Sequence, residues 1–77
     1  MVIENTSISG VFIYTSDFIM DTRGSFGRTF CQQSLRSILG LRNIQQINLS
    51  KSHKIGTVRG MHYQHEPFAE MKIIRCL

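Results

Sequence analysis

The pattern of apolar and polar positions in the first half of the chain predicts two short strands followed by one helix. Residues 10–15 start at a glycine and continue with β-branched and aromatic side chains, which favours a strand. The tetrapeptide at 21–24 (Asp-Thr-Arg-Gly) has the residue order of a type I turn, and residues 25–30 then alternate aromatic and polar positions as a second strand. Residues 31–39 repeat apolar side chains at helical spacing, and Gly40 follows as a C-terminal cap. This segment is the single predicted helix.

The second half of the chain returns to the pattern of strands. Residues 44–49 place apolar side chains on one face and amides on the other. The polar segment 51–56 predicts a hairpin loop, and residues 57–64 are the predicted return strand. Pro67 interrupts any continuation, so residues 70–77 form a separate last strand.

Together these elements predict a mostly β fold, a cupin-type antiparallel jelly roll that is incomplete and carries one short helix. Five or six short strands separated by turns at roughly ten-residue spacing are typical of antiparallel sandwiches and barrels. A jelly roll needs about eight strands, so residues 1–77 are expected to be a single partial domain. The last segment is strand-like up to Leu77, without a turn or polar tail. We therefore expect the chain to be the N-terminal part of a longer protein.

Composition agrees with a packed protein in a reducing compartment. The 77 residues are 42% hydrophobic and 18% charged, which excludes a disordered tail. The two cysteines, Cys31 and Cys76, lack the spacing of a disulfide framework or a zinc ribbon. The chain has no signal-peptide pattern and no apolar run near the ~18 residues of a membrane span. We expect a soluble cytoplasmic protein with no membrane partner.

The net charge of +4 comes from nine Lys and Arg against five Asp and Glu. These cations form no run and no helical stripe, so they fit a phosphate-bearing small ligand as well as they fit a nucleic acid. We expect no nucleic-acid partner, and keep a small basic nucleic-acid-binding domain as an alternative. Its cations would be Arg23, Arg28, Lys51, Lys54 and Arg59, with Phe12, Phe26 and Tyr63 as stacking partners.

The densest cluster of chemically active side chains is the segment 57–64 (Thr-Val-Arg-Gly-Met-His-Tyr-Gln), followed by Lys72. On a regular strand Arg59 and His62 face opposite sides, because side chains alternate. A bulge at Gly60 would return both to one face. With Lys72 on the next strand, an Arg, a His and a Lys would then converge inside a barrel. The simpler alternative is that each is an ordinary surface or hydrogen-bonded residue.

Two other kinds of site are weighed and set aside. His62, His65, Glu66 and Glu70 are all metal-ligand types, but the two histidines diverge on a strand and Pro67 prevents the helix that would bring them together. Neither cysteine is expected beside a histidine or a helix N-terminus, so nucleophilic catalysis by a thiol is not favoured. We expect no metal site.

Several segments, in order and spacing, resemble the N-terminal part of the dTDP-4-dehydrorhamnose 3,5-epimerase family, which are sugar-nucleotide enzymes of the cupin fold. The resemblance extends from residue 10 to residue 75. The segments that carry it are Asp21-Thr22-Arg23-Gly24-Ser25-Phe26, Arg28-Thr29-Phe30-Cys31, Gln46-Ile47-Asn48-Leu49-Ser50, Gly56-Thr57-Val58-Arg59-Gly60-Met61-His62-Tyr63-Gln64 and Lys72-Ile73-Ile74-Arg75.

The resemblance implies an isomerase of deoxysugar (rhamnose) biosynthesis with His62 as its catalytic base. That histidine would remove the proton next to the C4 ketone of dTDP-4-dehydro-6-deoxyglucose, on the way to dTDP-4-dehydro-rhamnose. A proton α to a carbonyl becomes removable when a neutral imidazole is in reach and a fixed cation meets the oxygen as it becomes an enolate. Lys72 matches the position near that oxygen. The substrate-binding positions that the resemblance implies are Arg23, Gln46, Asn48, Arg59 and Lys72.

The resemblance also implies what else the reaction needs. No metal or organic cofactor is expected, because the ketone itself stabilises the carbanion. A homodimer is expected, with N-terminal strands exchanged or packed across the interface. The family's proton-donating tyrosine and the carboxylate that orients the base lie beyond residue 77, so this chain alone is not expected to complete an epimerisation. The alternative is a truncated, non-catalytic cupin fragment that binds nucleotide or only oligomerises.

Overall fold

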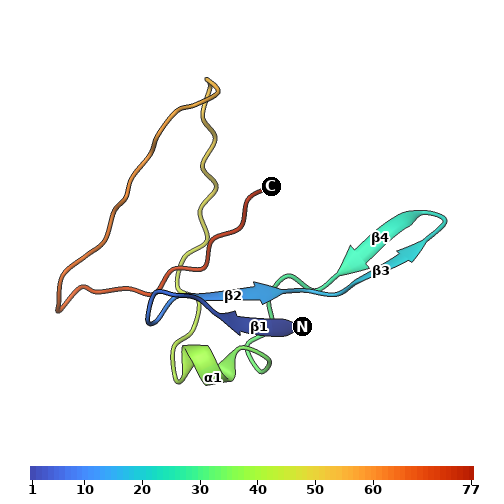
Figure 1. Cartoon of the computed structure of the whole chain (residues 1–77), viewed down its shortest axis with the longest axis horizontal. Coiled ribbons are helices and arrows are strands. Elements are labelled where there is room, and N and C mark those ends of the chain that lie inside the picture. Colours follow the sequence, from blue (N-terminus) through green and yellow to red (C-terminus); the bar gives the residue numbers. More distant parts are fainter. The chain divides into compact units, whose positions relative to one another are not determined.

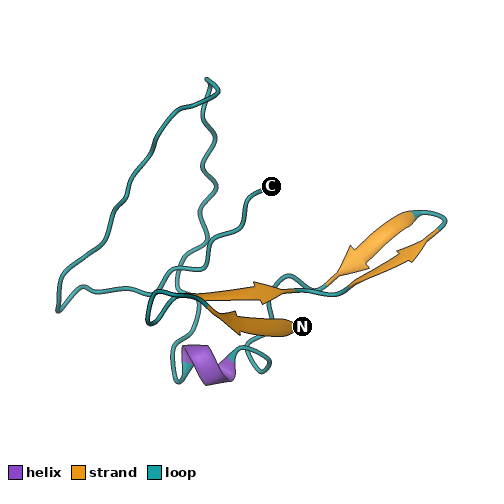
Figure 2. Cartoon of the chain, in the orientation of Figure 1, coloured by secondary structure: helices purple, strands orange, loops and turns teal.

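The computed structural model describes residues 1–77 and contains two small antiparallel sheets and one short helix (Figures 1 and 2). The elements are β1 (Val2–Asn5), β2 (Phe12–Thr15), β3 (Phe18–Asp21), β4 (Gly24–Gly27) and α1 (Arg36–Leu39). The expected class, mostly β with antiparallel pairing and one short helix, is confirmed, and it is consistent with a partial cupin-like fold. The single helix has four residues, far fewer than a lipid bilayer requires.

The chain divides into two compact units, Met1–Ile47 and Asn48–Leu77. All the strands and the helix belong to the first unit, whereas the second consists of loop and turn segments (Figure 2). The expectation of a single partial domain over residues 1–77 stays a prediction.

The first sheet pairs β1 with β2, with Val2 opposite Thr15. The hydroxyl of Thr6 organises the connecting loop, because it donates to the Val11 carbonyl at 2.8 Å and accepts from the Ile8 N–H at 3.1 Å. The strand at 10–15 is confirmed as β2, but its partner β1 was not predicted. Two β-branched residues followed by a Thr/Ser/Gly-rich loop were the available signal.

The second sheet is a tight hairpin of β3 and β4 around the predicted turn. Asp21 pairs with Gly24, and Gly24 adopts φ +138°, a conformation that favours glycine. Phe18 pairs with Gly27 at the open end, where a Cβ on the glycine would lie 2.7 Å from the Phe18 ring. The turn and β4 are confirmed, although β4 ends at Gly27 rather than at residue 30. The strand before the turn, β3, was missed.

The helix is shorter than predicted. Regular helix covers only Arg36–Leu39, and the preceding residues form turns in which the Leu35 N–H donates to the Cys31 carbonyl at 3.0 Å. The Gly40 cap is confirmed, since its N–H donates to the Arg36 carbonyl at 2.8 Å and its φ is +60°. No side chain caps the N-terminus. Without a capping side chain, the first backbone N–H groups of the helix have no side-chain acceptor, and a longer helix toward residue 31 is not stabilised.

The strands predicted at 44–49, 57–64 and 70–77 are wrong, because these segments contain no regular secondary structure. A β-rich sequence becomes a strand only when a neighbouring strand satisfies its backbone groups. None of the three finds such a neighbour in this chain. The predicted loop at 51–56 does contain a turn, which the Thr57 hydroxyl closes by donating to the Lys54 carbonyl at 2.7 Å.

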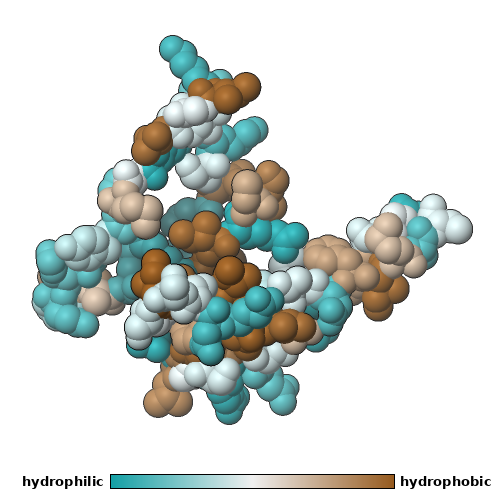
Figure 3. All heavy atoms as spheres, in the orientation of Figure 1, coloured by the Kyte–Doolittle hydropathy of each residue, from teal (hydrophilic) through white to brown (hydrophobic).

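The hydrophobic core is very small. Leu35 and Leu39, on one side of the helical segment, are the buried apolar residues, with 2% and 5% of their surface exposed. Most other large apolar side chains are exposed, and apolar patches are visible on the face shown in Figure 3. The apolar packing of the chain therefore depends on the two leucines of one helical turn.

Replacing Leu35 by alanine is expected to destabilise the Met1–Ile47 unit by about 2–5 kcal/mol, because the change leaves a cavity where the core is. Urea denaturation followed by amide NMR signals of this unit measures the effect. Leu41→Ala is the matched control, since Leu41 is 101% exposed and its truncation should change the free energy of unfolding by less than about 0.5 kcal/mol. Equal effects of the two changes would contradict this assignment of the core.

Candidate functional site

The residues predicted to form a site are distributed over both units. Arg23 and Gln46 belong to Met1–Ile47, whereas Asn48, Arg59, His62 and Lys72 belong to Asn48–Leu77. Gln46 and Asn48 are exposed in a loop segment and make no hydrogen bond within the chain. Their role in substrate binding stays a prediction.

The Lys72 side chain contacts the His62 backbone within the second unit. The Lys72 ammonium donates to the His62 backbone carbonyl at 3.2 Å, and lies 3.4 Å from the Glu70 carboxylate. Both side chains of this ion pair are partly exposed, which makes the pair weak. The hydrogen bond joins two segments ten residues apart, and it brings the predicted cation next to the backbone of the predicted base.

The bulge predicted at Gly60 does not form, because no strand forms around this residue. Its φ is +115°, in the region that favours glycine. A Cβ built on Gly60 would lie 3.3 Å from Nδ1 of His62, so the imidazole folds back toward this glycine. A side chain at position 60 would therefore both strain the backbone and press on the predicted base.

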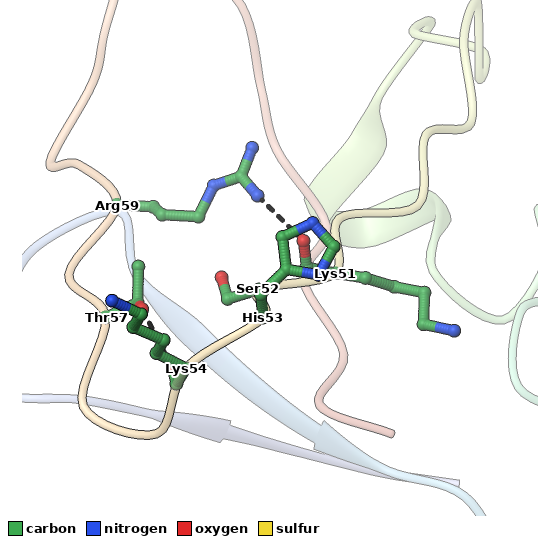
Figure 4. Close-up of a pocket in the computed structure, with 6 residues that line it drawn as sticks. All are labelled: Lys51, Ser52, His53, Lys54, Thr57 and Arg59. Carbon is green, nitrogen blue, oxygen red and sulfur yellow. Dashed lines mark hydrogen bonds between the residues drawn. The ribbon is translucent and has the colours of Figure 1, made fainter.

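Arg59 lies in a cavity of about 400 Å³ formed by the loop that precedes it (Figure 4). Its guanidinium Nη1 donates to the Lys51 carbonyl at 3.2 Å, across the opening of the loop. The lining residues are Lys51, Ser52, His53, Lys54, Thr57 and Arg59. His62 and Lys72 are not among them, so the convergence of Arg59, His62 and Lys72 on one cavity stays a prediction.

Sequence reasoning missed this cavity. It treated the segment from Lys51 to Gly56 only as a polar hairpin loop. A signal was present, however, because the chain contains no Asp or Glu between Asp21 and Glu66. Cations in that stretch have no carboxylate near them in sequence with which to pair.

Arg23 is held by Asp21 in the loop of the β3–β4 hairpin. The Arg23 side chain donates to Asp21 Oδ2 through Nε at 3.2 Å and through Nη2 at 2.7 Å, and the Arg23 backbone N–H donates to Oδ1 at 2.8 Å. These bonds lower the pKa of the Asp21 carboxyl, the side-chain hydrogen bond from Arg23 having the largest effect. The Arg23 side chain is highly exposed, at 89%, so this ion pair is a surface pair as well.

Lowering the pH is expected to release Arg23 from Asp21. Because the pKa of Asp21 is below its ordinary value of 3.8 in the folded hairpin, the contribution of the pair to stability is present above that value and is lost as the pH falls through the folded pKa. A carboxyl-carbon NMR titration measures this directly. Arg23→Gln should return the Asp21 titration toward its ordinary value; an unchanged titration in that variant would contradict the assignment.

Cys31 is a residue whose surroundings the sequence did not predict. It was expected to lie away from any helix N-terminus, but its carbonyl accepts from the Leu35 N–H in the turn that leads to α1. Hydrogen bonds from the Ser34 side chain and backbone N–H, with a smaller effect of the Arg28 charge, lower the pKa of this thiol to about 7. Cys31 and Cys76 are both unpaired.

The residues considered as metal ligands do not gather into one group. No three His, Cys, Asp or Glu side chains lie close enough together to hold an ion. His65 instead lies against Tyr63, with ring centroids 5.1 Å apart and the rings at 73°. This edge-on contact gives His65 a packing partner.

Comparison with known proteins decides the family. Residues 5–77 match the family model described as dTDP-4-dehydrorhamnose 3,5-epimerase. The chain belongs to this epimerase family. The family is one of isomerases, and the match includes all the residues predicted to form the site.

Individual members of the epimerase family are similar along the whole chain. A dTDP-4-dehydrorhamnose 3,5-epimerase of Sinorhizobium fredii (strain NBRC 101917 / NGR234) is 38% identical over 76 residues, which are 99% of this chain and 39% of the relative. One from Shigella flexneri is 38% identical over 78 residues, covering 100% of this chain and 42% of the relative. One from Escherichia coli (strain K12) is 35% identical over 77 residues, covering 99% and 41%. The chain spans about two fifths of the length of these relatives. No solved structure matches it significantly.

Proposed function

We propose that this chain carries the proton-abstracting half of a sugar-nucleotide epimerase site, with His62 as the base. The observation that carries the proposal is the family match, whose members are named as dTDP-4-dehydrorhamnose 3,5-epimerases. The hydrogen bond between Lys72 and the His62 carbonyl supports it, because it brings the predicted cation and the predicted base into one neighbourhood.

The proposed step breaks the C–H bond next to the C4 ketone of dTDP-4-dehydro-6-deoxyglucose. The proton passes to the His62 imidazole, and the bonding electron pair moves toward the ketone oxygen, which becomes an enolate. The Lys72 ammonium stabilises that developing charge. The proposed substrate-binding residues are Arg23, Gln46, Asn48, Arg59 and Lys72, the last through the ketone oxygen. The ketone itself stabilises the carbanion, so the proposed step uses no cofactor.

The proposed partners are the dTDP-linked 4-keto-6-deoxy sugar and a second copy of the chain. The many exposed apolar side chains support association, because covering them on a partner would bury surface that now contacts water. The two unpaired cysteines support the proposed cytoplasmic location.

Hydrogen exchange in deuterated water tests the proposal. The chain is incubated with dTDP-4-dehydro-6-deoxyglucose, and deuterium at C3 and C5 is followed by NMR and mass spectrometry. Proton removal needs only the base, so we expect deuterium incorporation without accumulation of the epimer. The absence of any exchange would contradict catalysis by this chain.

A second candidate is nucleotide binding without catalysis, as expected for a cupin fragment. The observation that favours it is coverage, since the chain corresponds to about two fifths of its relatives. Binding of dTDP with no deuterium incorporation would select this candidate. Binding of random single-stranded DNA with a steep salt dependence, and no binding of dTDP, would instead select the nucleic-acid alternative.

A further inference from the structure

Five glycines of the chain have a positive φ, and one of them differs from the others in its surroundings. At four of them a built Cβ would meet no atom within 4 Å, namely at Gly10, Gly24, Gly40 and Gly56. Backbone conformation alone accounts for a glycine at those positions. Gly60, with φ +115°, has the same conformational requirement and also a close neighbour. That neighbour is His62, the predicted base.

Contacts at both ends of His62 define where its imidazole lies. At the backbone, the His62 carbonyl accepts from the Lys72 ammonium at 3.2 Å. At the side chain, a Cβ built on Gly60 would lie 3.3 Å from Nδ1 and 3.7 Å from Cε1, and Nε2 is further away. Because His62 is exposed, few other neighbours limit the rotation of its ring. The bare backbone at position 60 is therefore a main boundary of the imidazole.

We propose that Gly60 is a positioning residue for His62. Its missing side chain lets the imidazole fold back with the Nδ1 edge toward the backbone, which leaves Nε2 as the nitrogen open to the substrate. The catalytic part of this assignment rests on the proposed function, in which His62 takes the proton. A general base has to lie within hydrogen-bond reach of that proton, so the direction of its ring matters as much as its identity.

A methyl group on Gly60 would act on the ring directly. A Cβ contact at 3.3 Å is shorter than ordinary van der Waals contact, so Nδ1 would have to move by a few tenths of an ångström. Misplacement of a reacting group by about 1 Å costs about 10²-fold in rate. We therefore expect a loss of about tenfold from this smaller displacement.

The test compares Gly60→Ala with Gly56→Ala in the full chain. Gly56 has φ +80° in the same unit, so Gly56→Ala strains the backbone without adding a contact to His62. Gly60→Ala should shift the imidazole ¹⁵N signals of His62 and lower the deuterium-exchange rate at saturating substrate about tenfold, with KM changed less than about twofold. Gly56→Ala should leave the His62 signals in place and the saturating rate within about twofold.

D-alanine at position 60 separates the direction of the added methyl group from the loss of glycine. A D residue adopts positive φ without strain and carries its methyl group in place of the other Hα atom. The chain can be synthesised as two peptides joined at Cys31. We expect the D-alanine chain to keep the His62 signals and the exchange rate of the unaltered chain.

Equal changes in Gly56→Ala and Gly60→Ala would overturn the proposal in favour of a general loosening of the unit. Unchanged His62 signals in Gly60→Ala, or equal losses with L- and D-alanine, would overturn it as well. The unaltered chain supplies a measurement that needs no variant, a nuclear Overhauser effect between Gly60 Hα and His62 Hε1. Its absence would contradict the contact.

The two kinds of measurement keep this proposal distinct from the proposed function. If the unaltered chain exchanged no deuterium while Gly60→Ala alone shifted the His62 signals, catalysis by His62 would fail. The same result would confirm the contact between Gly60 and the imidazole and remove its role in proton transfer.

Discussion

Replacing His62 by alanine is expected to reduce deuterium incorporation into dTDP-4-dehydro-6-deoxyglucose by about 10²–10⁴-fold, the usual contribution of a positioned general base. Without the imidazole, no group is assigned to take the proton from carbon, and the exchange should fall to the rate in buffer. Mass spectrometry of the recovered substrate measures the rate. Because His62 is exposed, its removal should leave the fold of the chain unchanged.

His65→Ala provides the matched control for that result. His65 is also an exposed histidine of the same unit, three residues further along. Its ring lies edge-on to Tyr63, and its backbone carbonyl, which alanine retains, accepts from the Phe68 N–H at 2.9 Å. Its loss should leave the exchange rate within about twofold. If His62→Ala retained full exchange, or if both variants lost it equally, His62 would not be the base.

Replacing Lys72 by methionine is expected to lower the exchange rate about 10²–10³-fold at saturating substrate, the typical effect of losing one donor to a developing oxyanion. The ammonium is assigned to a charge that exists only as the enolate forms. The variant should therefore lose more in rate than in substrate affinity. Exchange kinetics over a range of substrate concentrations separate the two effects.

Glu70→Gln is the control for Lys72. It removes the carboxylate 3.4 Å from the ammonium and leaves the ammonium itself in place. Exposed ion pairs contribute about 0–1 kcal/mol, so the exchange rate should change no more than about fivefold. A Lys72→Met variant with an unchanged rate would remove Lys72 from the reaction and assign it only to the backbone of His62.

Elements held by contacts close in sequence were predictable, and those that need a distant partner were not. The turn at Asp21–Gly24 closes within four residues, and the Gly40 cap contacts the preceding helical turn, so both follow from local residue types. The segments at 44–49, 57–64 and 70–77 have strand-like side chains but no paired neighbour. These segments have the residue types of strands but do not form strands. The backbone hydrogen bonds of a sheet require a neighbouring strand, which a segment's own sequence does not supply.

The candidate site shows the same difference between what local sequence predicts and what it does not. The order of the motifs from Arg23 to Arg75 was enough to indicate the epimerase family, and the family match agrees with it. Spacing alone did not place Lys72 at the His62 carbonyl or Arg59 at the Lys51 carbonyl. Those relations depend on how loop segments turn back on themselves, which alternation rules for regular strands do not describe.

From the order of its residues alone, this chain reveals its family and its class of fold and yields a prediction of the side chains that abstract the proton, since these depend on chemical identity and local spacing. The folded chain decided the rest: which strands pair, that the core reduces to Leu35 and Leu39, that Arg23 donates to Asp21, and that a basic cavity forms around Arg59. Each of these features depends on distances and backbone directions in space. The sequence determines them only through the combined effect of all the contacts in the folded chain.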